Sequence, residues 1–168
     1  MFPLDKLLLM QLSTRWASVS LPHLVTAVKS RLRQVAFRRL APHGISPQQY
    51  QLLMAISEQD GRCQGDLARC TWMDKPTASR ILRTLQDRGL IRAEADPTHG
   101  RRVLFFLQPE AESLVLELQD FRRYMRENIE QGFSAEEKRQ IRILMGAVMA
   151  NLDRMDAESG GPASGSEE

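Results

Sequence analysis

Short polar and basic residues gather between Asp74 and Arg83. The set comprises Lys75, Pro76, Thr77, Ser79, Arg80 and Arg83. Hydroxyl and guanidinium groups near the start of a helix are the groups that hydrogen-bond base edges and phosphates in the major groove of DNA. The plainer alternative is a surface helix whose arginines are simply solvated. The elements around this segment must therefore decide between the two readings.

The segment itself has the signals of a capped amphipathic helix. Asp74 is a favourable N-cap, and Pro76 fits the first turn, where its missing N–H is tolerated. The apolar residues recur at helical spacing at Ile81, Leu82 and Leu85. Gly89 can adopt the left-handed conformation that ends a helix. A shorter helix over about 64–70 precedes it, which gives a helix–turn–helix.

After Gly89 the apolar period changes from 3.6 to 2, which is typical of strands. Residues 91–95 alternate, residues 96–100 contain Asp-Pro and Gly, and residues 102–108 alternate again. The pattern predicts a β-hairpin with Arg101 and Arg102 beside its tip. A helix–turn–helix followed by a basic-tipped hairpin predicts a winged helix.

Long helices are predicted on both sides of this unit. We expect one over residues 3–17, one from Ser20 to about Pro42, one from the capping box at Ser46 to Gln59, and two after Pro109 and Ser134. The predicted division is residues 1–45 and 109–156 for dimerisation helices, 46–108 for the winged helix, and 157–168 for a disordered tail. The fold class is mainly α, with a small β-hairpin wing.

The terminal helices carry wide apolar stripes that a lone winged helix does not need. The last helix carries Ile141, Leu144, Met145, Val148, Leu152 and Met155. A helical core shared by two copies of the chain would cover these stripes. Two-fold symmetry would then present two recognition helices to one duplex, with half-sites about one helical turn apart.

The composition argues against several other classes of protein. The net charge of +2 is mild, so a nucleic-acid footprint must come from local clustering. No apolar run reaches the roughly 20 residues of a membrane span, and no cleavable signal is evident, so we expect a cytoplasmic protein. We find no nucleophile–base pair, carboxylate pair or phosphate loop, and His23, His43 and His99 share no ligand spacing. We therefore expect no enzyme, no cofactor and no metal.

The sequence resembles the MarR-type winged-helix transcriptional regulators. The resemblance rests on ISPQQYQLLMAI, LAR, DKPTASRILRTLQDRGLI and ADPTHGRRVLFFLQPEA, and covers about residues 20–155. It implies that Lys75, Pro76, Thr77, Ser79 and Arg80 face the major groove and that Arg83 reaches a phosphate. It also implies that Asp96 orients one wing arginine while the other, either Arg101 or Arg102, enters the minor groove. Trp72 and Gly100 depart from the family pattern at the turn and at the wing tip.

The resemblance further implies a homodimeric regulator, which we expect to be a repressor on a pseudo-palindromic operator. In the family, a small and often aromatic or phenolic ligand binds between the dimerisation helices and the winged helix. The candidates to line such a cleft are Trp16, His23, His43 and Tyr50. Two alternatives remain: a redox switch through Cys63 or Cys70, and a winged helix that binds protein rather than double-stranded DNA.

Overall fold

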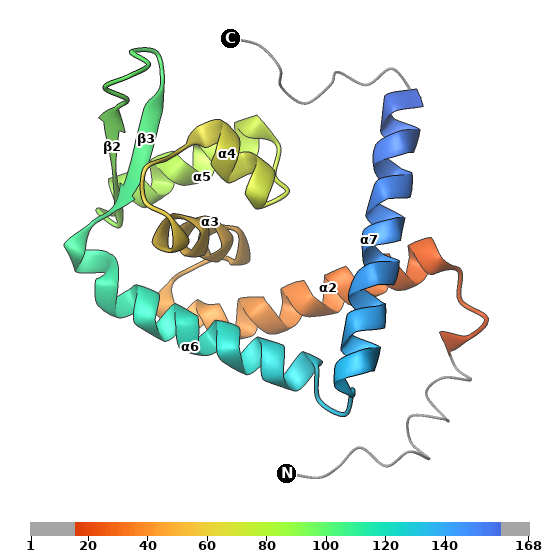
Figure 1. Cartoon of the computed structure of the whole chain (residues 1–168). Coiled ribbons are helices and arrows are strands. Elements are labelled where there is room, and N and C mark those ends of the chain that lie inside the picture. Colours follow the sequence, from red (N-terminus) through yellow and green to blue (C-terminus); the bar gives the residue numbers. More distant parts are fainter. Residues whose placement is uncertain (1–15, 159–168) are drawn as a thin grey trace.

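The computed structural model describes residues 16–158 of the 168-residue chain, with the elements labelled in Figure 1. The helices are α2 (Leu21–Leu40), α3 (Pro47–Glu58), α4 (Gln64–Cys70), α5 (Lys75–Asp87), α6 (Glu112–Ile129) and α7 (Ala135–Glu158). The strands are β1 (Arg62–Cys63), β2 (Ile91–Ala95) and β3 (Val103–Leu107), and two 3-10 turns cover Ala41–His43 and Pro109–Ala111. The predicted helix over residues 3–17 lies outside the described residues, except for its last two positions.

Local capping explains where the central helices begin. The Ser46 hydroxyl accepts from the Gln49 amide at 3.1 Å, and the Gln49 side chain accepts from the Ser46 amide at 2.8 Å. This reciprocal pair satisfies two amide donors that a helix start leaves free. The same arrangement joins Ser134 and Glu137 before α7. The capping box predicted at Ser46 is therefore confirmed.

The sheet has three antiparallel strands in the order β1-β3-β2. The predicted hairpin is confirmed, with Ile91 opposite Leu107 and Ala95 opposite Val103. Strand β1 was not predicted from the sequence; it pairs Arg62 with Phe105 and Cys63 with Leu104. A strand of two residues is too short to show alternation in the sequence, so β1 can be recognised only from its pairing with a distant strand.

Two boundaries differ from the sequence prediction. Pro109 begins a 3-10 turn rather than the α-helix, since the Ala111 amide donates to the Gln108 carbonyl, and α6 starts at Glu112. At the other end, α7 continues through Ala157 to Glu158, so the predicted tail starts two residues too early. Residues 159–168 lie outside the described part of the chain.

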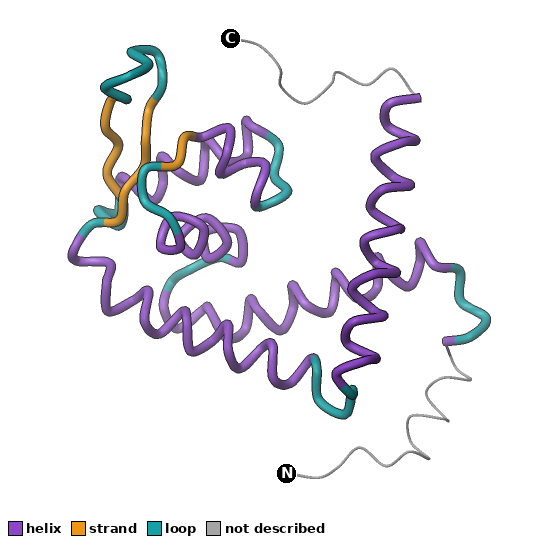
Figure 2. Tube along the Cα trace, viewed as in Figure 1, coloured by secondary structure: helices purple, strands orange, loops and turns teal. Residues whose placement is uncertain are grey.

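The hydrophobic core lies in the winged helix and extends into the flanking helices. It contains Ile45, Leu52, Leu53, Ile56, Leu67, Ile81, Leu82, Leu85, Ile91 and Phe105. Leu40 at the end of α2 and Leu118 in the middle of α6 are fully buried in the same cluster. These two side chains anchor the long helices to the winged helix, which Figure 2 shows as one group of short helices and strands.

The remaining surfaces of the long helices are uncovered in the single chain. Figure 1 shows α7 rising from the end of α6, on the opposite side of the molecule from the hairpin. Along the described length of α7 no residue is buried. The predicted stripe on this helix therefore remains at least partly exposed within residues 16–158.

Candidate nucleic-acid interface

The start of α5 is fixed by its cap. The Asp74 carboxylate accepts from the Thr77 amide at 2.8 Å. This backbone hydrogen bond, followed by the Thr77 hydroxyl, lowers the pKa of Asp74, which therefore stays ionised at neutral pH. A carboxylate at this end also interacts favourably with the helix dipole. The predicted N-cap is confirmed.

One face of α5 is buried, and the residues predicted to contact DNA lie away from that face. Ala78, Ile81, Leu82 and Leu85 are buried. Lys75, Pro76, Arg80 and Arg83 are exposed, while Thr77 and Ser79 are half-buried. Among the described residues, the side chains of Lys75, Arg80 and Arg83 make no hydrogen bond and no ion pair. These three cations remain available to an external anion.

The wing tip is built around Asp96. Its carboxylate accepts from the Thr98 amide at 2.8 Å, the Thr98 hydroxyl at 2.7 Å and the His99 amide at 3.3 Å. These bonds, the Thr98 hydroxyl first, lower the pKa of Asp96. In the free chain the carboxylate therefore orders the turn and does not hold Arg101 or Arg102. Its role toward a wing arginine remains a prediction for a DNA-bound state.

The wing arginines are presented by the backbone of this turn. The Asp96 amide donates to the Arg102 carbonyl at 2.9 Å, and the Arg102 amide donates to the His99 carbonyl at 2.7 Å. Arg101 and Arg102 are both exposed. Within the described chain neither guanidinium has a hydrogen bond or an ion pair. The wing therefore carries a second pair of available cations.

Short connections join the wing to α5. Gly89 ends α5 with φ of 67°, and the Leu90 amide donates to the Leu85 carbonyl. The Gln108 amide then donates to the Leu90 carbonyl at 3.1 Å, which closes the base of the hairpin. Figure 1 shows the hairpin projecting beside the α4 and α5 pair.

The four candidate ligand residues are not brought together. Trp16 lines a groove of about 600 Å³ between α2 and α6, which we call the α2–α6 groove. Tyr50 lines a separate pocket and packs edge-on against Phe121, with ring centroids 5.2 Å apart. His43 pairs with Glu117 at 2.9 Å, and His23 is exposed on α2.

Most of the residues that line the pocket beside Tyr50 were not predicted from the sequence. This pocket, called the α3–α6 pocket below, has a volume of about 230 Å³. Its polar and aromatic lining includes Tyr50, Glu58, Arg62, Cys70, Trp72 and Arg122. Burial raises the pKa of Tyr50, and the charge of Arg122 opposes that shift. The two arginines are 60 positions apart in the chain, so no local pattern joins them.

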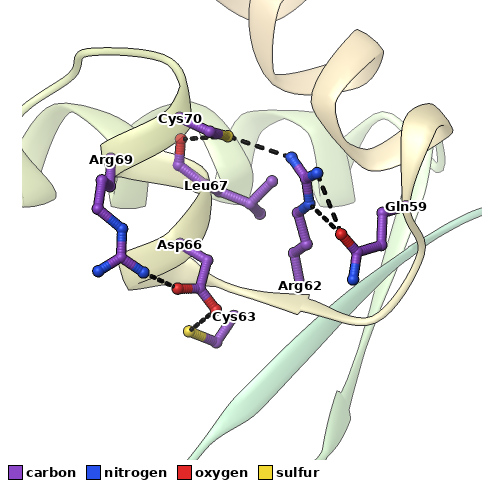
Figure 3. A network of polar contacts seen from close by, with 7 residues as sticks. All are labelled: Gln59, Arg62, Cys63, Asp66, Leu67, Arg69 and Cys70. Atoms are coloured by element: carbon purple, nitrogen blue, oxygen red, sulfur yellow. Dashed lines mark hydrogen bonds and ion pairs between the residues drawn. The ribbon is translucent and has the colours of Figure 1, made fainter.

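The two cysteines lie in one polar network, drawn in Figure 3. Both thiols are free, and Cys70 is exposed. Cys63 donates to the Asp66 carboxylate at 3.2 Å. Cys70 accepts from the Arg62 guanidinium at 3.3 Å and donates to the Leu67 carbonyl at 3.4 Å. The two thiols therefore have opposite environments, one beside an acid and the other beside a cation.

Two properties of the described residues concern membranes and metals. Between Trp16 and Glu158, none of the helices is long and apolar enough to span a membrane. Over the same stretch, no three His, Cys, Asp or Glu side chains gather where they could hold a metal ion.

Comparison with known proteins agrees with this geometry. The sequence profile of the MarR family matches residues 43–102, which run from the start of the winged helix to the wing tip. A curated protein of Thauera aromatica, "Putative transcriptional regulatory protein for hcr operon", is 26% identical over 137 residues, which cover 82% of this chain and 80% of the relative.

Solved structures show the same fold. The S. aureus MepR–DNA complex matches with a TM-score of 0.74 at 24% identity, covering 79% of this chain and 96% of that chain. The transcriptional regulator SlyA matches with a TM-score of 0.74 at 16% identity, covering 81% and 96%. Taken with the capped recognition helix and the basic wing, the MarR-family match over residues 43–102 and the shared fold support a MarR-type winged-helix, DNA-binding transcriptional regulator.

Proposed function

We propose that this regulator is a homodimeric repressor that binds a pseudo-palindromic operator and leaves it when a small ligand binds. The observation that carries the proposal is the pairing of two exposed basic elements, α5 and the wing, with an uncovered apolar surface on the long helices. Each element alone has other uses. Together they fit two recognition helices held at a fixed spacing by a shared helical core.

The dimer part of the proposal rests on the apolar surface of α2, α6 and α7. Its exposed members include Val28, Leu32, Val35, Ile129, Ile141, Leu144, Met145 and Leu152. Soluble monomers rarely leave so many large apolar side chains exposed on neighbouring helices. A second copy of the chain is the fitting cover, because a two-fold dimer also positions two wings.

The DNA part assigns roles to the available cations. Lys75, Pro76, Thr77, Ser79 and Arg80 would face the major groove, and Arg83 would contact a phosphate. Arg101 or Arg102 would enter the minor groove. The match to the MarR family over residues 43–102 and these unpaired arginines both favour double-stranded DNA over a protein partner.

The experiment that tests the proposed function is sedimentation of the full chain with and without a random-sequence duplex. We expect a dimer in the free state and two chains on each duplex. A protein that sediments as a monomer and does not bind the duplex at low salt would contradict the proposal.

The last part of the proposal is that ligand binding is coupled to release of DNA. A ligand changes DNA affinity only through its different affinity for the DNA-compatible and incompatible arrangements. The α2–α6 groove is apolar and belongs to the proposed dimer surface. The α3–α6 pocket is lined by both the winged helix and α6, so it is the better placed of the two to couple ligand to DNA.

A redox switch is the second candidate, because the Cys70 thiol is exposed and accepts a hydrogen bond from the Arg62 guanidinium. We expect the ligand switch instead, so mild peroxide should leave DNA binding of the wild type unchanged. The measurement is duplex binding before and after oxidation for the wild type, Cys70→Ser and the matched control Cys63→Ser. The redox switch would be established if peroxide abolished DNA binding by the wild type and by Cys63→Ser but left DNA binding by Cys70→Ser unchanged.

A further inference from the structure

The tip of the wing contains a histidine that the roles proposed above do not use. His99 lies in the turn between β2 and β3, and 66% of its side chain is exposed. Figure 1 shows this turn at the end of the hairpin, projecting away from the helices. Arg101 and Arg102 follow within three residues. A group at this position would therefore approach DNA together with the two wing arginines.

The hydrogen bonds around the ring determine which of its nitrogens carries the proton. The Asp96 carboxylate accepts from the Thr98 hydroxyl at 2.7 Å, and this bond lowers the pKa of Asp96, which stays ionised at neutral pH. An ionised carboxylate can only accept, and a hydroxyl has one proton to donate. The same hydroxyl oxygen lies 2.9 Å from Nδ1 of His99, so toward the ring it can only accept. Nδ1 of His99 therefore carries the proton.

The other ring nitrogen, Nε2, is then a bare acceptor as long as the ring is neutral. Within residues 16–158 it makes no hydrogen bond. Phosphate oxygens and the minor-groove edges of A·T pairs are acceptors as well, so the neutral ring cannot bond to them. Moving the proton to Nε2 would leave Nδ1 beside a hydroxyl that already donates to Asp96. A second proton on Nε2 keeps the bond to Thr98 and adds both a donor and a positive charge.

Charged groups of both signs lie near this ring in the wing. Asp96 lies 3.7 Å from Nδ1 of His99 and would attract an imidazolium. The two wing arginines are cations of the same turn and would repel it. Further along β2, Arg92 and Glu94 pair with each other at 2.8 Å, and among the described residues no ion pair reaches His99 from another element. A DNA phosphate beside the ring would add a negative charge and so favour the imidazolium.

We propose that His99 is a further DNA contact of the wing, in which the ring, protonated on both nitrogens, donates from Nε2 to a phosphate. The proposal rests on the wing–DNA contact described above and adds one residue and one proton to it. Histidine is the side chain that ordinarily titrates between about pH 5 and pH 8. Because DNA favours the protonated ring, protonation favours DNA binding to the same extent. The affinity for DNA is therefore highest at low pH and falls as the pH rises through this range.

The position of the proton is tested without DNA, so this test fails independently of the proposed function. Nuclear magnetic resonance of the full chain with isotope-labelled ring nitrogens, at about pH 8, should show His99 protonated at Nδ1. The signal is assigned by its loss in His99→Gln. Thr98→Val removes the hydroxyl at nearly constant shape and should move the proton toward Nε2. A wild-type ring that already carries its proton on Nε2 would overturn the proposal, because such a ring can donate to a phosphate without taking up a second proton.

The contact itself is tested by duplex binding of the full chain at about pH 5.5 and about pH 8, near the two ends of the histidine range, at several salt concentrations. An exposed pair of charges is worth roughly threefold in affinity, so the two wings of a dimer should make binding about tenfold tighter at the lower pH. Each phosphate that an imidazolium neutralises should also steepen the salt slope by about one unit. Protonation far from the DNA would leave that slope unchanged.

Three variants assign this pH dependence to one residue. His99→Gln cannot be charged, so it should bind at both pH values as the wild type does at the higher one. His99→Lys is always charged and should bind at the higher pH about as tightly as the wild type does at the lower one. The matched control is His23→Gln, which removes an exposed histidine from α2 and should keep the full pH dependence. A pH dependence that persists in His99→Gln, or is lost equally in His23→Gln, would overturn the contact alone. A wild type that binds no duplex at either pH would contradict the proposed function together with it.

Discussion

Replacing Arg80 by alanine is expected to weaken operator binding and to relax base preference at one position of each half-site. A paired contact from arginine to guanine is worth about 1–3 kcal/mol of discrimination. With two half-sites, the loss is roughly thirtyfold or more in Kd. Arg80 is exposed on α5, and its guanidinium makes no hydrogen bond in the described chain, so its removal should leave the helix itself intact.

Wing variants provide the comparison for this prediction. Arg101→Ala and Arg102→Ala should weaken operator and scrambled duplex more evenly, because the minor groove offers width and potential but little sequence code. The double variant should lower the salt slope by about one unit for each phosphate that the wing no longer neutralises. Binding is measured on both duplexes at several salt concentrations. If the wing variants lose base preference and Arg80→Ala loses only general affinity, the two roles are reversed.

The second large effect is expected from Leu144→Glu in α7. Leu144 is 66% exposed in the single chain and lies on the apolar stripe. A carboxylate buried in an apolar dimer core without a partner costs several kcal/mol. We therefore expect dissociation or unfolding of the dimer and loss of operator binding, measured by sedimentation and by duplex titration.

Ala150→Glu is the matched control for this substitution. It introduces the same charge on the same helix, six positions further and so roughly 240° around the axis, on the side away from the stripe. Ala150 is also exposed. It should leave the dimer and DNA binding intact. If the Leu144→Glu protein stays dimeric and binds the operator like the wild type, α7 is not part of the dimer interface.

Features that depend on residues close together in the sequence were predicted correctly. Ser46 and Asp74 announce their helices because a cap needs only residues three positions apart. The hairpin follows from a change of period and a turn cluster, both within 20 residues. The apolar stripe of α7 was visible in the sequence for the same reason, although the surface proposed to cover it belongs to another chain.

Features that depend on distant contacts were missed. Strand β1 exists because Arg62 meets Phe105, and the α3–α6 pocket exists because Arg122 meets Glu58. The left-handed conformation of Trp72 contradicts its local preference, so it reflects the geometry that its neighbours impose. The engagement of Asp96 by Thr98 and His99 likewise depends on how the wing turn closes.

The central claim is that two copies of this chain read DNA through α5 with two-fold symmetry. The most direct measurement is selection of bound duplexes from random DNA by the purified full-length protein. We predict an inverted repeat whose half-site centres lie about one helical turn apart. Absence of any enriched sequence, or enrichment of a single site without a symmetric second half, would contradict this account.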